Sequence, residues 1–131
     1  MREILFRGKS DLLGWIEGWY CPEVKWGEHH FPVGITHKTK EGWLEDVVVI
    51  PETIGQFTGL TDKNGKKIFE GDILKRTNGN KYVWYVDYKN CAFCANQSNC
   101  NYACELGELL DQIELEVIGN IHDNPELLEN P

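Results

Sequence analysis

The chain has 131 residues, with 13 lysines and arginines, 21 aspartates and glutamates, and a formal net charge of −8. This length favours a single domain over residues 1–131, with a subdivision into residues 1–52 and 53–131 as the alternative. The acidic balance argues against a protein that is held to nucleic acids or to anionic membranes by its overall charge.

The acidic excess lies near the C-terminus, because residues 105–131 contain eight acids and no lysine or arginine. The remaining 13 acids balance the 13 bases of residues 1–104. The eight acids are Glu105, Glu108, Asp111, Glu114, Glu116, Asp123, Glu126 and Glu129. They are interpreted either as the solvated face of a helix and an edge strand, or as an assembly surface for a basic patch on an identical chain.

The composition is that of an ordinary globular protein, with 41% hydrophobic and 26% charged residues, and its 13 glycines and 5 prolines favour turns over long helices. No apolar run approaches the ~20 residues that cross a bilayer, and no signal-peptide core follows the first residues. We therefore expect a cytoplasmic protein without membrane contact. In that compartment its five cysteines are thiols or metal ligands rather than disulfides.

The N-terminal part of the chain predicts short strands and turns. Strands are expected over residues 2–8, 15–20, 31–36 and 43–50. The first two can pair as a hairpin. Between the second and the third, the polar residues 21–31 predict an irregular loop. The apolar run Val47–Ile50 stops at Pro51, which cannot donate to a central ladder.

Two Asn-Gly turns mark the centre of the sheet. Asn64–Gly65 separates residues 56–60 from Ile68–Phe69, and Asn78–Gly79 separates residues 72–76 from 81–88. Asn-Gly favours two-residue hairpins because both residues tolerate positive φ. The spacing is typical of antiparallel hairpins or a meander that form a partly closed, SH3-like barrel.

The C-terminal part adds minor helical structure. Leucines and an isoleucine at i, i+3, i+4 and i+7 predict one short helix near Glu105–Ile113, followed by a strand over residues 115–121. Asn124–Pro125 then predicts a short helical turn. The fold class expected from the sequence is therefore mainly β, with a minor α component.

Four cysteines within 14 residues form a candidate metal site. They are Cys91, Cys94, Cys100 and Cys104, spaced as C-x2-C-x5-C-x3-C. Zn²⁺ takes four thiolates in a tetrahedron, and such a site is structural because no coordination position stays open. The x5 spacer is shorter than is common between zinc half-sites, so free thiols and redox-active pairs remain alternatives.

One predicted hairpin combines bases with aromatic rings, which is how single-strand binders present stacking platforms beside positive charge. The residues are Lys75, Arg76, Lys81, Tyr82, Trp84 and Lys89. The competing interpretation is a core strand or a subunit interface, because Tyr82, Trp84, Val86 and Tyr88 share one face. A nucleic-acid interface is thus the alternative function. An enzyme is not expected, since neither a nucleophile elbow nor a carboxylate pair fixed by spacing is present.

Three stretches together carry a family resemblance. They are MREILFRG at residues 1–8, PETIGQFTGLTDKNGKKIFEGDIL at 51–74 and VIGNIHDNPELL at 117–128. The chain resembles the YopX protein family, small proteins of phages and prophages that have no established biochemical activity. The resemblance implies a mainly β fold, oligomeric assembly and an accessory role in the bacterial host cell.

Together these patterns indicate a non-enzymatic, self-associating module that binds a host or phage protein. Self-association also follows from the aromatic supply of 5 Trp, 5 Tyr and 5 Phe, since such residues are enriched at interfaces. Within the shared block, Asp72 is expected to cap a turn before Ile73 and Leu74 enter the core. The turn Asp62–Lys67 is interpreted as fold-specifying, with a binding surface as the alternative.

Overall fold

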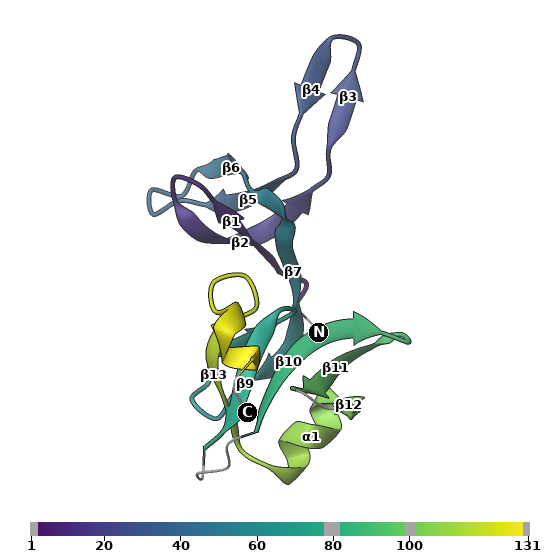
Figure 1. The fold of residues 1–131 in the computed structure, drawn as a ribbon. Helices are drawn as coiled ribbons and strands as arrows, with labels where there is room; N and C mark the ends of the chain where they lie inside the picture. The colour runs from purple at the N-terminus through teal and green to yellow at the C-terminus, as the bar shows by residue number, and fades with distance from the viewer. Residues whose placement is uncertain (1–2, 78–81, 99–101, 130–131) are drawn as a thin grey trace. The chain divides into compact units, whose positions relative to one another are not determined.

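A computed structural model describes residues 3–77, 82–98 and 102–129. It is mainly β with antiparallel strands, one α-helix and one 3-10 turn, which confirms the expected fold class. The chain divides into two compact units, residues 1–57 and 58–131 (Figure 1). The division falls inside one long strand, whereas the sequence suggested a subdivision after residue 52. No helix in the described ranges is long and apolar enough to span a membrane.

The first unit is built on antiparallel neighbours in the order β6-β5-β2-β1-β7, and β7 continues into the second unit. Its strands are β1 (Phe6–Ser10), β2 (Gly14–Cys21), β3 (Val24–Trp26), β4 (His29–Phe31), β5 (Gly34–Lys38), β6 (Leu44–Val48) and β7 (Ile50–Thr61). The predicted β1–β2 hairpin is confirmed, with Ser10 opposite Gly14 across a three-residue turn. Gly14 has φ +76°, which only glycine adopts cheaply.

Small residues let the strands of this unit approach closely. A Cβ on Gly18 would lie 2.1 Å from the carbonyl oxygen of Thr36, and one on Gly34 would lie 2.7 Å from that of Val47. Ile35 is fully buried, and Val47 nearly so. The side of the sheet that carries Ile35 and Val47 is called the inner face below.

Pro51 does not end its strand, as the sequence suggested, but lies inside β7 at an irregularity. Lys9 pairs with Ile50 and Arg7 with Gly55, so the register shifts between them. There the Thr53 hydroxyl accepts a hydrogen bond from the Lys9 N–H at 2.8 Å and donates one to the Ile50 carbonyl at 2.6 Å. A bulge tolerates proline because the ladder is already interrupted there.

The irregular loop predicted over residues 21–31 is wrong. Strands β3 and β4 form a two-stranded hairpin in this segment, with Trp26 opposite His29. Gly27, at φ +61°, begins the two-residue turn and supplies the conformation that a type II′ turn requires. The polar composition concealed a pattern in which Lys25 separates Val24 from Trp26 before this glycine, and His30 separates His29 from Phe31 after it.

The second unit combines the end of β7 with a five-stranded sheet in the order β12-β11-β10-β9-β13. Its further elements are β8 (Lys67–Phe69), β9 (Asp72–Arg76), β10 (Val83–Lys89), β11 (Ala92–Gln97), β12 (Ala103–Glu105), α1 (Leu106–Gln112), β13 (Leu115–Asn120) and the 3-10 turn Pro125–Leu128. The β9–β10 pairing is confirmed, but its predicted turn at Asn78–Gly79 lies outside the described residues. The partly closed, SH3-like form stays a prediction.

One hydrophobic core holds the second unit together. Its buried members are Ile68, Leu74, Trp84, Val86, Ala95, Leu106, Leu109 and Leu115. The predicted helix is confirmed: α1 buries Leu106 and Leu109, and Leu110 and Ile113 pack against the same core. The i, i+3, i+4, i+7 spacing therefore identified the face of the helix that meets the sheet.

Two aspartates of the family-like block stabilise turns of this unit. The Asp72 carboxylate accepts a hydrogen bond from the Phe69 N–H at 2.8 Å, and Ile73 and Leu74 directly after it are fully buried, as expected. The Asp62 carboxylate accepts hydrogen bonds from three backbone N–H groups. Two belong to its own turn (Asn64 and Lys66), and the third is that of Val117 in β13. Hydrogen bonds that hold turns in this way agree with the interpretation that residues 51–74 specify the fold.

Candidate functional site

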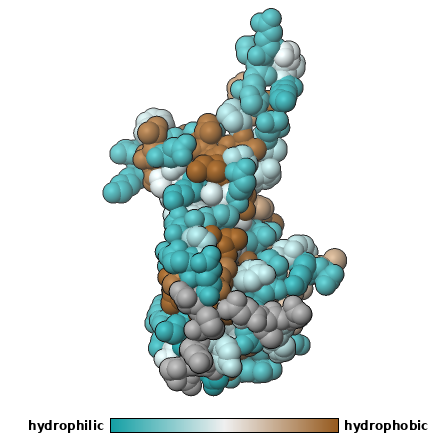
Figure 2. All heavy atoms as spheres, in the orientation of Figure 1, coloured by the Kyte–Doolittle hydropathy of each residue, from teal (hydrophilic) through white to brown (hydrophobic). Residues whose placement is uncertain are grey.

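Large apolar side chains are exposed mainly on the first unit. Its exposed members are Ile4, Leu12, Leu13, Trp19, Tyr20, Val24, Trp26, Phe31, Trp43, Leu44 and Val48. In the described part of the second unit the corresponding set is Tyr82, Tyr88 and Tyr102. Figure 2 shows hydrophobic side chains gathered on the visible face of the first unit. Exposed apolar side chains at this density are typical of an interaction surface.

The β3–β4 hairpin has one apolar side and one charged side. Val24 pairs with Phe31 and Trp26 with His29, so these four side chains share a face. The ring centroids of Trp26 and His29 lie 6.3 Å apart, and those of His29 and Phe31 lie 6.4 Å apart. The hairpin with this face is called the aromatic arm. Its Trp26 side chain is 75% exposed.

The opposite side of the aromatic arm carries an ion pair. Glu23 accepts a hydrogen bond from His30 at 3.1 Å and lies 3.8 Å from the Lys25 ammonium. The hydrogen bond with His30, followed by the charge of Lys25, lowers the pKa of Glu23. These polar groups stay in water, so the arm is amphipathic and has only its aromatic face to bury.

The aromatic arm continues the ladder between β2 and β5. Tyr20 pairs with Ile35 and Cys21 with Gly34, and Val24 with Phe31 has the same register. Residues 22–23 and 32–33 interrupt the ladder without shifting it. The arm is a separate two-stranded sheet, and its apolar residues Val24, Trp26 and Phe31 are exposed.

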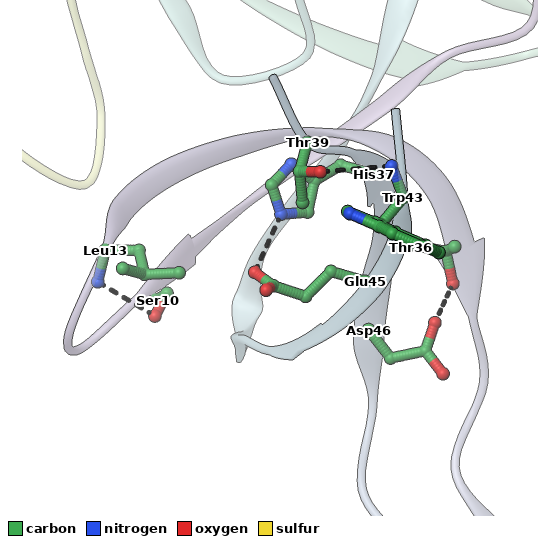
Figure 3. A network of polar contacts seen from close by, with 8 residues as sticks. All are labelled: Ser10, Leu13, Thr36, His37, Thr39, Trp43, Glu45 and Asp46. Atoms are coloured by element: carbon green, nitrogen blue, oxygen red, sulfur yellow. Dashed lines mark hydrogen bonds and ion pairs between the residues drawn. The ribbon is translucent and has the colours of Figure 1, made fainter. Parts of the chain in front are cut away.

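A hollow of about 420 Å³ lies elsewhere on the first unit, between the β1–β2 turn and β6. It is lined by Ser10, Asp11, Leu12, Leu13, Glu45, Asp46, Val47 and Val48. The Ser10 hydroxyl accepts a hydrogen bond from the N–H of Leu13 (Figure 3) and another from the N–H of Leu12, and these two bonds hold the turn in shape. Leu12 is 93% exposed, so the hollow presents apolar groups to solvent.

Cross-strand hydrogen bonds hold two of the three carboxylates that line the hollow. Glu45 accepts one from His37 at 3.2 Å, and Asp46 accepts one from the Thr36 hydroxyl at 2.5 Å (Figure 3). The Cys21 thiol lies 2.9 Å from the same hydroxyl. Both acids are therefore positioned by side chains of the neighbouring strand β5.

The structure describes three of the four cysteines of the candidate zinc site. Cys100 lies outside the described residues. Cys104 of β12 pairs with Ala95 of β11, so their side chains lie on the same side of the sheet. Cys94 directly precedes Ala95, and its side chain therefore points to the opposite side. Burial raises the pKa of Cys104, and Cys94 and Glu108 add to this effect. Across the described ranges, no three side chains of the types that bind metals converge. The zinc site stays a prediction.

The basic, aromatic hairpin is only partly at the surface. Trp84 is 5% exposed and belongs to the core, so its ring offers no stacking platform in this structure. Tyr82 and Lys75 are exposed, and the Lys89 ammonium donates to the Asn96 side-chain oxygen at 2.6 Å. Lys81 lies outside the described residues.

The acidic C-terminal strand lies beside this hairpin. Lys75 is directly opposite Glu116, and Arg76 is opposite Leu115, in the pairing of β9 with β13. Opposite charges at facing positions of an antiparallel pair attract. Lys75 of the basic hairpin and Glu116 of the acidic C-terminal part thus face each other within one sheet.

Sequence reasoning missed the aromatic arm and the hollow. The arm has a sequence signal, since Val24, Trp26, His29 and Phe31 alternate with charged residues around Gly27. The hollow has none, because its two walls are more than 30 residues apart in the sequence and meet only in the folded sheet.

Comparison with known proteins points to one family. A family model described as YopX protein matches residues 23–129, most of the chain. The fold is similar to the crystal structure of protein EF1440 from Enterococcus faecalis, with a TM-score of 0.57 and 25% sequence identity. That match covers 98% of this chain and 99% of the other. No curated protein matches the sequence.

Proposed function

This chain belongs to the YopX protein family, and on that premise we propose a non-enzymatic accessory protein of phages and prophages that self-associates and binds a protein partner. The observation that carries the proposal is the exposure of Trp19, Trp26 and Trp43 on one unit. Tryptophan is the residue type most enriched where binding energy concentrates. A solvated indole on a small sheet contributes little to folding, so burial by another protein accounts for it better.

A non-enzymatic role agrees with the polar groups of the first unit. The carboxylates of Glu45 and Asp46 accept hydrogen bonds from His37 and Thr36 across the sheet. These bonds fix side chains in the ladder rather than arrange an acid and a base around a substrate. The proposed location is the bacterial cytoplasm.

Sedimentation velocity over 2 to 100 micromolar protein tests self-association. We expect an average mass that rises with concentration toward a defined oligomer. A strict monomer at tens of micromolar would contradict this part of the proposal. Affinity capture from lysogenic host cells tests partner binding, and Trp19→Ala is the matched variant, because it removes an exposed indole while leaving the strand pairing intact.

A further inference from the structure

We propose that the edge of β6 accepts an extended segment of a partner protein as an additional strand, and that this segment carries a lysine or arginine opposite Asp46. The proposal rests on the partner binding proposed above and names the surface and the chemistry of the partner. Among the described residues, β6 pairs with β5 on one side and with no strand on the other. Addition of a strand at such an edge is a recurring way for a domain to bind an extended peptide.

The hydrogen-bond pattern identifies the backbone groups of β6 that face away from β5. Just before β6, the Thr39 N–H donates to the Trp43 carbonyl at 2.7 Å. Just after it, the Val49 N–H donates to the Val33 carbonyl at 3.3 Å. Bonded and non-bonded pairs alternate in an antiparallel ladder, so every second residue between these pairs directs its N–H and C=O outward. These outward residues are Leu44, Asp46 and Val48.

The other sheet edges in the described ranges are short or capped. The edge strands β8 and β12, and both strands of the β3–β4 hairpin, are three residues long. The edge of β13 is capped, because the Leu115 carbonyl accepts the N–H of Lys63 at 3.1 Å and the Val117 N–H donates to the Asp62 carboxylate at 2.9 Å. Natural sheets use such devices to prevent unwanted pairing. β6 has five residues and lacks both devices, which leaves its edge able to pair.

The side chains of the outward residues favour an apolar partner strand with one polar position. Leu44 and Val48 are 66% and 60% exposed, and Asp46 lies between them on the side opposite the inner face. Trp19 pairs with Thr36, which pairs with Asp46, so its exposed indole lies on the same side. Apolar side chains of an added strand, placed opposite Leu44 and Val48, would remove both from water.

The charges beside this edge call for a basic residue at the centre of the partner segment. The hollow next to β6 is lined by the carboxylates of Asp11, Glu45 and Asp46 and by no lysine or arginine. Lys38 lies opposite Leu44 and supplies positive charge at that end of the strand. A cation therefore fits best opposite Asp46, where opposite charges attract across an antiparallel pair.

The same charge argues against a second copy of β6 as the added strand. Two β6 strands that pair about a two-fold axis and use all their outward groups place the two Asp46 side chains directly opposite each other. Like charges at such positions repel. The edge therefore suits a segment of another protein, and self-association uses other surfaces.

Amide hydrogen exchange, followed by NMR on the full chain, tests the edge. The probe is a synthetic peptide with capped ends, TVTKTVT, which presents two valines and a central lysine to the outward residues. On saturation with the peptide, we expect exchange at Leu44, Asp46 and Val48 to slow at least tenfold. Glu45 and Val47, whose N–H groups already bond to β5, should change less than threefold. Absence of binding, or binding without this alternation, would overturn the proposal.

Two variants separate backbone pairing from charge. Val48→Pro removes an outward N–H that β5 does not use, a change that an edge strand tolerates, and it should weaken peptide binding at least tenfold. Val48→Thr keeps that N–H and is the matched control, expected within threefold of wild type. The peptide TVTETVT should bind wild type about fivefold more weakly than TVTKTVT, and Asp46→Lys should reverse this preference. An unchanged preference would refute the role of Asp46.

The outcome for the edge is distinguishable from the outcome for partner binding. A partner that is captured from host cells by wild type and equally by Val48→Pro would overturn the edge assignment and leave the proposed function standing. Capture of no partner would count against the proposed function, whereas the exchange pattern with the peptide would still decide the edge. Circular dichroism confirms that each variant is folded, and the exchange experiment on wild type does not depend on any variant.

Discussion

We expect removal of the Asp62 carboxylate to lower the free energy of unfolding of the second unit strongly, although only a few atoms are removed. Its Oδ1 accepts the N–H groups of Asn64 at 2.8 Å and Lys66 at 2.9 Å, and its Oδ2 accepts the N–H of Val117 at 2.9 Å. The residue is 6% exposed. One carboxylate therefore holds the β7–β8 turn and fastens it to β13, across 55 residues of chain.

The expected magnitude follows from what Asp62→Ala leaves behind. A hydrogen bond to a charged group contributes about 1.5–3 kcal/mol, and an orphaned buried donor costs about 1–3 kcal/mol. Asn64 and Lys66 are exposed and regain water, whereas Val117 is half-buried in the sheet. We therefore expect Asp62→Ala to lower the free energy of unfolding by about 3 kcal/mol. We expect Asp62→Asn to lower the free energy of unfolding by nearly as much. An asparagine has only one acceptor oxygen, so its NH₂ group would face one of the backbone N–H donors.

Urea denaturation followed by fluorescence and circular dichroism measures this loss. Asp111→Ala is the matched control, since Asp111 is an exposed residue of α1, and it should stay within about 0.5 kcal/mol of wild type. A loss below about 1 kcal/mol for Asp62→Ala would refute the reasoning that this carboxylate ties the turn to β13.

The same site predicts a pH dependence. Burial alone would raise the pKa of Asp62, but the N–H groups of Val117, Lys66 and Asn64, together with the Lys66 charge, outweigh it and lower the pKa. Because the folded pKa lies below the unfolded one, the carboxylate's stabilisation is complete above about pH 4 and is lost as the pH falls through the folded value. The difference between wild type and Asp62→Asn should shrink over that range, and a constant difference down to pH 2 would contradict the argument.

Three further outcomes follow from packing and register. Gly18→Ala should unfold the first unit, because its Cβ would lie 2.1 Å from the Thr36 carbonyl oxygen; an unchanged melting curve would rule this out. Trp84→Ala should lower the free energy of unfolding by about 3–5 kcal/mol, since the indole is a core side chain, and urea denaturation measures it. Elemental analysis should find one zinc per chain that is lost in Cys94→Ser if the four cysteines form the predicted site; protein without zinc would refute it, in line with the pairing that places Cys94 and Cys104 on opposite sides of the sheet.

Much of the second unit could be predicted because its signals are local. The Asn64–Gly65 turn, the spacing of leucines along α1 and the capping role of Asp72 each depend on residues within a few positions of one another. Turn chemistry and helical periodicity act at that range. The candidate site was harder, because the polar residues around Gly27 conceal a hairpin with one aromatic face, and the hollow joins β6 to a turn more than 30 residues earlier.

The sequence by itself determined the family, the mainly β class and the number of charged and aromatic side chains. Only the tertiary structure decided where these groups lie. Trp84 is buried while Trp26 is exposed, and Glu116 lies opposite Lys75 instead of on a separate patch. The reason is physical: composition and local pattern set what each strand can bury, but the pairing of strands distant in sequence selects which side chains face a core and which charges meet.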